Sequence, residues 1–209
     1  MHRLRESTPR GELVREELTA AVIAGGTARR MGTDKRLILV DGVPLLARSV
    51  AAVARVAGEV LVATTPDHPL PVELPDVRIV VDRVTNGGPL AGIEAALAAA
   101  SHPLVLVVAA DMPWLAEPLL ELLVAGARDA KDADAIAIQS DRGLEPMLAV
   151  YRKTALRTLT ALVDRGEHRV GRLLELIDTV AVPPHDWRQV DPDGRSLVNL
   201  NTREDLHLR

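Results

Sequence analysis

In residues 18–36, LTAAVIAGGTARRMGTDKR, an apolar run ends in a glycine pair and leads into a cationic segment. The run 18–24 is short and partly β-branched, which is typical of a buried parallel strand. Glycines directly after a strand let the backbone approach a ligand and direct N–H groups at it. Because Arg29, Arg30 and Lys35 stand against only Asp34 in the loop, the stretch predicts a strand followed by an anion-binding loop. A triphosphate is the complementary ligand.

Two standard phosphate loops do not fit this spacing. A Walker A loop needs Gly-Lys-Ser/Thr in a row, whereas two residues separate Gly32 from Lys35. A dinucleotide fingerprint needs G-x-G-x-x-G, and Gly25, Gly26 and Gly32 do not supply it. A glycine turn with solvated arginines remains an alternative at this point.

Downstream of this stretch, apolar runs alternate with helical patterns of ten or more residues. Helices are predicted at 44–57, 89–100, 117–130, 154–164, 170–177 and 202–208. Strands are predicted at 59–63, 77–81, 104–109, 133–138, 147–151, 179–182 and 197–200. The alternation predicts an α/β fold of three layers, α/β/α, with a mostly parallel sheet and one antiparallel strand. In such sheets ligands bind beyond the carboxyl ends of the strands, where the strand order reverses.

Composition limits the classes of function. The chain has 209 residues, so we expect one domain over residues 18–209, preceded by a flexible polar leader at 1–17. A net charge of -4 provides no general attraction for nucleic acid or an anionic membrane surface, and we expect neither partner. Without cysteine there is no disulfide, thiolate metal site or cysteine nucleophile. No secretory signal or membrane-spanning run is present, which favours a cytoplasmic protein.

Seven short motifs are spread along the chain. They are AGGTARRMGTDK at 24–35, DGVPLL at 41–46, GGPLAGI at 87–93, ADMPW at 110–114, EPMLAVY at 145–151, GEHRV at 166–170 and VNLNTREDL at 198–206. Together these motifs resemble the nucleotidyltransferases with a Rossmann-like fold, and in particular the molybdenum cofactor guanylyltransferases (MobA-like proteins). The resemblance covers about residues 20–206.

The resemblance implies transfer of GMP from GTP to the phosphate of molybdopterin. The products would be molybdopterin guanine dinucleotide and pyrophosphate, and Mg2+ would be required. Molybdoenzymes or cofactor-delivery proteins are the expected protein partners. Two alternatives stay open: a related transferase that uses CTP or a sugar phosphate, and a non-catalytic nucleotide-binding module.

The resemblance also implies the site residues. The nucleotide would be bound by Ala24, Gly25, Gly26, Lys35, Thr65, Asp82 and Asp111. Arg30, Lys35 and Asp111 would be catalytic, and Arg169, Asn199 and Asn201 would bind molybdopterin. Thr65 stands where the family often has Asn, and His168 where it usually has a second cation.

The residues themselves support part of this set. Asp111 ends the most apolar strand, and Mg2+ prefers one or two carboxylates with phosphate oxygens and water. Capping of the next helix is the alternative role for Asp111, but that helix begins only at about residue 117. Asn199 and Asn201 lie two apart on a predicted strand and would point to one face. Their alternative is a turn at the start of the last helix.

Overall fold

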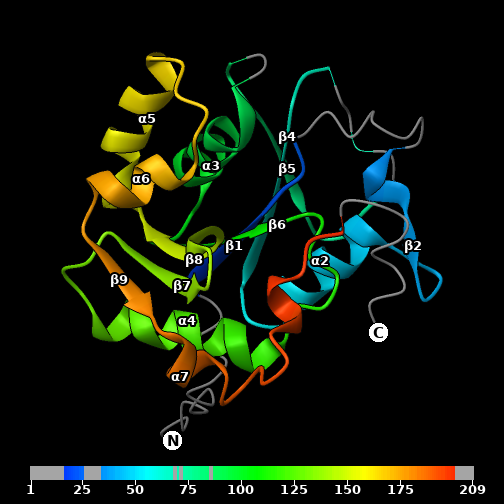
Figure 1. Ribbon diagram of the computed structural model, residues 1–209. Coiled ribbons are helices and arrows are strands. Elements are labelled where there is room, and N and C mark those ends of the chain that lie inside the picture. The colour runs from blue at the N-terminus through cyan, green and yellow to red at the C-terminus, as the bar shows by residue number, and fades with distance from the viewer. Residues whose placement is uncertain (1–16, 26–33, 68–69, 71–72, 85–86, 201–209) are drawn as a thin grey trace, which may run out of the picture.

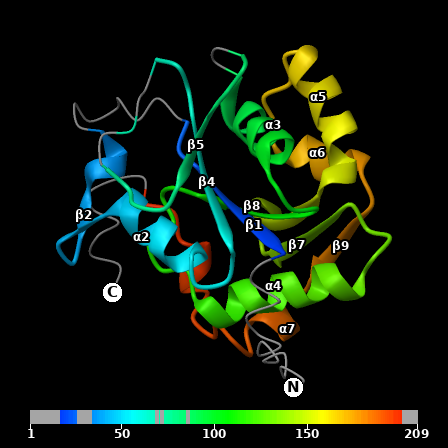
Figure 2. The same ribbon diagram turned by 180° about the vertical axis from the view of Figure 1, so that it is seen from behind.

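The computed structural model describes residues 17–25, 34–67, 70, 73–84 and 87–200. It has three layers: a central sheet, with α3, α5 and α6 on one face and α4 and α7 on the other (Figure 1). Helix α2 lies at the right of this view beside the β2–β3 hairpin, and the view from behind shows β5 at the edge of the sheet (Figure 2).

The sheet has seven strands in the order β5-β4-β1-β6-β8-β7-β9. The strands are β1 Leu18–Ile23, β4 Glu59–Thr64, β5 Arg78–Val81, β6 Leu104–Ala109, β7 Ala135–Ser140, β8 Gly143–Arg152 and β9 Thr179–Val182. All neighbouring pairs are parallel except those of β8, which is antiparallel to both β6 and β7. The predicted fold class, including its one antiparallel strand, is confirmed. The strand order reverses between β1 and β6, so a ligand crevice is expected beyond their carboxyl ends.

The helices are α2 Leu45–Val53, α3 Gly88–Ala99, α4 Glu117–Asp129, α5 Leu156–Asp164, α6 Gly171–Leu176 and α7 Pro184–Trp187. Shorter 3-10 turns occur at η2 Lys35–Leu37, η3 Lys153–Ala155 and η4 Arg195–Leu197. Among the described residues, no helix has both the length and the apolar content that crossing a membrane requires.

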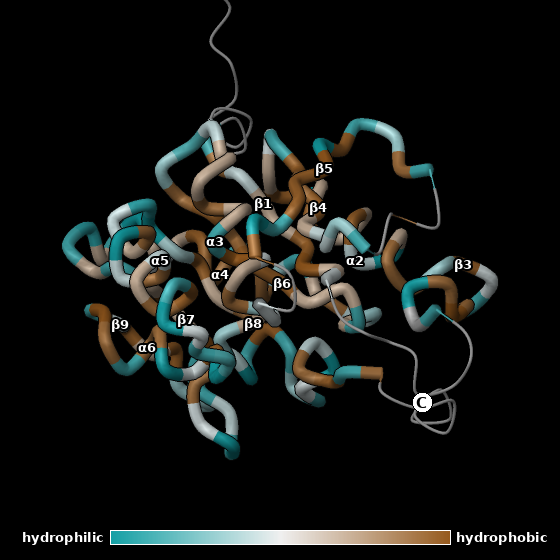
Figure 3. The backbone as a smooth tube through the Cα atoms, turned by 90° about the horizontal axis from the view of Figure 1, so that it is seen from above, coloured by the Kyte–Doolittle hydropathy of each residue, from teal (hydrophilic) through white to brown (hydrophobic). Residues whose placement is uncertain are grey.

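Strand β1 separates two hydrophobic cores. Its side chains are all buried and alternate between the faces, as a strand requires. Leu18, Ala20 and Val22 pack with α2 and α4, whereas Ala21 and Ile23 pack with α3 and α5. Colouring by hydropathy places the apolar segments along the central strands and the polar segments at the periphery (Figure 3). A chain without Phe therefore builds both cores mainly from Leu, Val, Ile and Ala, with Met112, Tyr151 and Trp187 as larger buried side chains.

The region 39–44 differs from the prediction. The structure forms a hairpin of β2 Leu39–Val40 and β3 Val43–Pro44, where the hydrophobic periodicity predicted a helix from residue 44. Asp41 and Gly42 form its two-residue turn with φ of 51° and 78°. An Asp-Gly pair is the usual sequence for such a turn, because both central residues need positive φ. The flanking strands are too short to give a periodic signal.

The last described segment also differs. Residues 197–200 were predicted as a strand, but the structure has the η4 turn followed by an irregular segment. Gly194, with φ of 63°, and the buried Asp191 form the bend before η4, and the Asp191 carboxylate accepts the backbone N–H groups of Arg195 and Ser196. The predicted loop 183–195 contains the short helix α7. The predicted leader and final helix lie outside the described residues.

Candidate active site

Four parallel strand ends deliver the candidate residues to one edge of the sheet. The Ala24 N–H donates to the Ala63 carbonyl at 2.8 Å, and the Asp82 N–H donates to the Thr64 carbonyl at 2.9 Å. On the other side of β1, the Ala110 N–H donates to the Ile23 carbonyl at 3.1 Å. The chain therefore leaves β1, β4, β5 and β6 side by side, at the reversal of strand order.

Gly25 is in close contact with two other predicted nucleotide residues. A Cβ atom on Gly25 would lie 3.2 Å from Thr65 Cγ2 and 3.4 Å from Asp82 Oδ2. The first distance is tighter than ordinary van der Waals contact, so a side chain here would displace Thr65. The absence of a side chain at Gly25 thus allows the residues that follow β1, β4 and β5 to pack closely. The structure brings Gly25, Thr65 and Asp82 together.

Asp82 is the most unusual of these groups. It is 3% exposed, and within the described residues neither carboxylate oxygen has a hydrogen-bond partner. Burial raises the pKa of Asp82 to about 6, and the nearby negative charge of Glu94 on α3 adds to the shift. An unpaired buried carboxylate costs free energy unless a ligand supplies donors. Asp82 is therefore a candidate acceptor for N–H groups of a bound molecule.

The turn η2 carries Lys35 between two residues that bind each other. Arg36 donates from Nε to Asp34 Oδ1 at 2.9 Å and from Nη2 to Asp34 Oδ2 at 2.6 Å. Arg36 is buried, and its Nη1 lies 3.5 Å from the Thr64 hydroxyl at the end of β4. This clamp fixes the backbone on both sides of Lys35, so η2 is anchored beside the β4 strand end.

Asp111 lies in a turn that α2 holds in place. The Ser49 hydroxyl on α2 lies 3.2 Å from the carbonyl oxygens of both Ala110 and Met112. Arg48 Nε donates to the Pro113 carbonyl at 3.2 Å. Helix α2 also packs against η2, so one helix supports both the Lys35 turn and the Asp111 turn. Helix α4 begins after Ala116, which confirms that Asp111 is not its cap.

The donor chemistry around Asp111 fits a magnesium ion that is shared with a substrate. Among the described residues there is no group of three His, Cys, Asp or Glu side chains that could hold a metal. A carboxylate at a strand end is the kind of single protein ligand that Mg2+ takes together with phosphate oxygens and water. Asp111 therefore suits a metal that arrives with a nucleotide.

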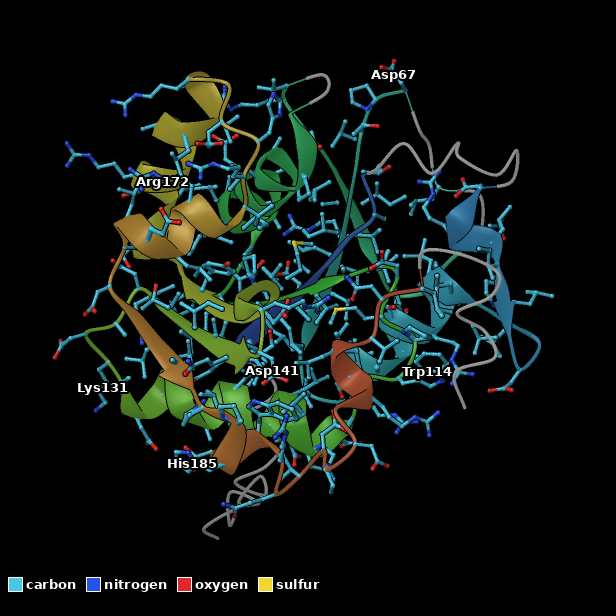
Figure 4. The ribbon with its side chains drawn as sticks, viewed as in Figure 1. Asp67, Trp114, Lys131, Asp141, Arg172 and His185 are labelled. Carbon is cyan, nitrogen blue, oxygen red and sulfur yellow. The ribbon has the colours of Figure 1, made fainter. Side chains whose placement is uncertain are left out.

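The C-terminal segment is attached to the same turn. The Leu200 N–H donates to the Asp111 carbonyl at 2.9 Å, and Leu200 is fully buried. Asn199, which is partly buried, precedes this anchor by one residue. Trp114 packs against the small core around Leu200 and lies near α2 and η4, across the view from Arg172 of α6 (Figure 4).

Arg169 belongs to a different group of elements. Its side chain is 73% exposed, and its Nε lies 3.7 Å from Glu167 Oε1. The neighbouring His168 approaches the start of α3, where its Nδ1 lies 3.8 Å from the Cβ position of Gly88. The segment after α5 therefore faces the first turn of α3.

Three predicted site residues, Gly26, Arg30 and Asn201, lie outside the described residues. Lys35 is placed by its backbone in η2. Two further features were missed by sequence reasoning: the buried Arg36 clamp and the ion pair of Arg83 with Glu94. A carboxylate on the otherwise apolar helix 88–99 was the available signal for the second, because a buried Glu needs a partner.

The chain has extensive similarity to known proteins. Residues 20–182 match the MobA-like NTP transferase domain. A protein of Chloroflexus aggregans, named probable molybdenum cofactor guanylyltransferase, is 39% identical over 91% of this chain and 92% of its own. A protein of the same name from Methanosarcina mazei is 33% identical, in an alignment that covers 97% of this chain and 94% of that protein. The crystal structure of molybdopterin-guanine dinucleotide biosynthesis protein A from Archaeoglobus fulgidus superposes with a TM-score of 0.75, at 25% identity over 90% and 94% of the chains.

Proposed function

The chain belongs to the MobA-like NTP transferase family, and on this basis we propose that it transfers GMP from GTP to molybdopterin, forming molybdopterin guanine dinucleotide and pyrophosphate. The relatives named above carry the name of this activity. The finer parts of the proposal, which are the roles of individual residues and the use of Mg2+, rest on the geometry of the crevice and on the chemistry of its groups.

The observation that carries the choice of nucleotide is Asp82. An ionised carboxylate can only accept hydrogen bonds. The Watson–Crick edge of guanine presents two adjacent donors, N1–H and the 2-amino group, which one carboxylate can bind together. Cytosine presents one amino group beside an acceptor nitrogen, so it would place a lone pair against Asp82. The unpaired oxygens of Asp82 beside Gly25 therefore support GTP over CTP.

The reaction needs no covalent enzyme intermediate. A phosphate monoester carries almost two negative charges at neutral pH, because its second pKa is about 6. One of its oxygens attacks the α-phosphorus of GTP, a new P–O bond forms, and the bond from the α-phosphorus to the bridging oxygen breaks. The electron pair of that bond leaves with pyrophosphate. The protein must align the two substrates and offset the accumulating negative charge.

The loop and strand ends would supply these two effects. Lys35, fixed between Asp34 and Arg36, would bind the triphosphate, and Arg30 would offset charge as pyrophosphate departs. Ala24, Gly25 and Gly26 would present backbone atoms to the nucleotide, with Thr65 beside them. Asp111 would hold Mg2+, which when bound neutralises phosphate charge and orients the α-phosphate.

Two segments would bind the acceptor. Asn199 precedes Leu200, whose N–H donates to the Asp111 carbonyl, so Asn199 would supply an amide near the Asp111 turn, and Asn201 would bind the same substrate. Arg169 and His168 would approach from the side of α3 and α5 and bind acceptor phosphate. Molybdoenzymes or cofactor-delivery proteins would take up the product.

The test is a pyrophosphate-release assay with purified protein, GTP, Mg2+ and molybdopterin. We expect release that depends on all three reagents. Asp111→Asn keeps the size of the side chain and should reduce the rate at least about 100-fold, since it removes a charged group that acts on the transition state. Normal nucleotide binding by the wild-type protein without any pyrophosphate release would instead support the non-catalytic module. Faster release from CTP than from GTP would support the related transferase.

A further inference from the structure

The carboxylate of Asp82 is buried just after β5, between Gly25 and Gly92 of α3. Its backbone N–H is fixed by the Thr64 carbonyl, but within the described residues neither of its side-chain oxygens is hydrogen bonded. Neither of these glycines has a side chain that could orient the carboxylate. The direction of this carboxylate therefore depends on how the chain is held immediately after β5.

Arg83, the next residue, provides that hold. Its Nε donates to Glu94 Oε2 and its Nη2 to Glu94 Oε1, both at 2.8 Å, so the guanidinium grips the carboxylate with two parallel bonds. The same Nη2 donates to Asp164 Oδ1, at the end of α5, at 2.7 Å. Paired Arg–carboxylate bonds of this kind fix geometry as well as charge. Arg83 thus joins the end of β5 to α3 and α5.

The same contact controls a buried charge. Only 6% of the Glu94 side chain is exposed, and its negative charge raises the pKa of Asp82. On the other side of the Asp82 backbone, Thr64 accepts the Asp82 N–H, and its hydroxyl lies 3.5 Å from Nη1 of Arg36, which is paired with Asp34. If Arg83 were absent, Glu94 would be a buried carboxylate without a counter-ion. The negative charge of Glu94 would then act on Asp82 without compensation and raise the pKa of Asp82 further.

We propose that Arg83 is a positioning residue for base recognition: its bonds to Glu94 and Asp164 fix the Asp82 carboxylate beside Gly25, and its charge offsets that of Glu94. The proposal rests on the proposed function, because it assumes that Asp82 accepts from guanine. Arg83 itself does not touch the nucleotide in this account. It acts through Asp82 alone, so its removal should weaken recognition of the base more than binding of the triphosphate.

The experiment compares binding of GTP and ITP, with Mg2+, from pH 5.5 to 8.5. ITP lacks the 2-amino group and so loses one of the two donors to Asp82. In wild-type protein we expect GTP to bind at least about 10-fold more tightly, the usual value of a hydrogen bond to a charged group. In Arg83→Met we expect GTP affinity at pH 7 to fall about 10-fold and the pH at which binding reaches its maximum to rise by about one unit. The preference for GTP over ITP should narrow.

Three further variants separate position from charge and from folding. Arg83→Lys keeps the charge but not the paired bonds, so it should bind GTP more weakly with the wild-type pH profile. Arg83→Met with Glu94→Gln removes both charges, so the pH profile should return to that of wild type while GTP affinity stays reduced. Arg78→Met is the matched control: Arg78 is the first residue of β5 and pairs with Glu59 at 2.7 Å, whereas Arg83 follows the other end of the strand.

Arg78→Met should lose stability while keeping the wild-type preference for GTP over ITP and the wild-type pH profile. The proposal is overturned if Arg83→Met matches wild type in both measurements, or if Arg78→Met shows the same changes. Failure of the proposed function gives a different result, because wild-type protein would then prefer ITP or CTP, or bind none of them. A wild-type preference for GTP that survives Arg83→Met rejects only the role of Arg83.

Discussion

Asp82→Asn should make the unliganded protein more stable as the pH rises, relative to wild type. In the folded chain the pKa of Asp82 is raised from 3.8 to about 6, so the folded state prefers the protonated acid. Its contribution is fully present below pH 3.8 and is lost as the pH rises through 6. The shift corresponds to roughly 3 kcal/mol at 1.36 kcal/mol per pKa unit.

Most of this free energy falls in an accessible range. Between pH 4.5 and 7.5 the wild-type protein should lose about 2 kcal/mol through Asp82, because ionisation of the unfolded chain is largely complete at pH 4.5. An amide does not titrate here, so Asp82→Asn lacks this loss. Other acids are common to both proteins and cancel in the difference. The unsatisfied amide adds a constant cost of about 1–3 kcal/mol.

The assay is urea unfolding of both proteins at pH 4.5, 5.5, 6.5 and 7.5, without nucleotide. The difference in free energy of unfolding should change by about 2 kcal/mol in favour of the variant across the series. Asp193→Asn, an exposed change of acid to amide, measures the background. Curves for wild type and Asp82→Asn that stay parallel within about 0.5 kcal/mol would refute the claim that Asp82 is a destabilised acid held for a ligand.

Three other predictions concern the surroundings of the site. Gly25→Ala places a Cβ atom 3.2 Å from Thr65 Cγ2. Nucleotide affinity, measured by titration calorimetry, should fall about 10-fold, while the free energy of unfolding in urea changes by less than about 1 kcal/mol. Unchanged affinity would contradict close packing at the end of β1. Ser49→Ala frees the carbonyls of the Asp111 turn and should lower kcat more than it raises KM for GTP; the reverse pattern would show that Ser49 does not position this turn. Burial opposes ionisation of Glu59, but hydrogen bonds from Thr19 and Ser101, together with the charge of Arg78, lower the pKa of Glu59 to about 2. The ionised Glu59 therefore stabilises the fold above about pH 4.5, and this stabilisation is lost as the pH falls toward 2. Glu59→Gln should therefore cost up to roughly 3 kcal/mol at pH 7 and much less near pH 2.5, and an equal cost at both pH values would contradict the assignment.

The parallel part of the fold could be predicted from the sequence because its strands are continuous apolar runs. Strand β6 is buried on both faces, so its pattern is a single run of Leu, Val and Ala that ends at Ala109. The β2–β3 hairpin was missed because its strands have two residues each and no measurable period. Residues 197–200 resemble a strand by composition. The bend at Gly194 and the η4 turn instead place them against the Asp111 turn, where they form no strand of the sheet.

The candidate site was predictable where a residue follows a strand. Gly25, Asp82 and Asp111 each come at or just after the end of a parallel strand, and parallel strands end at one edge of the sheet. The supporting contacts were not predictable in this way. Arg83 and Glu94 are 11 positions apart on different elements, and Arg36 is buried only because η2 folds against Thr64. Such pairs depend on tertiary packing, which a single sequence does not record.

A crystal structure of the protein with GTP and Mg2+ tests the central claim most directly. We predict electron density for guanine with N1 and the 2-amino group within hydrogen-bond distance of Asp82, and for the α-phosphate on the side of Asp111. Density for the nucleotide away from the crevice between the ends of β1 and β6, or with its base turned from Asp82, would contradict the account.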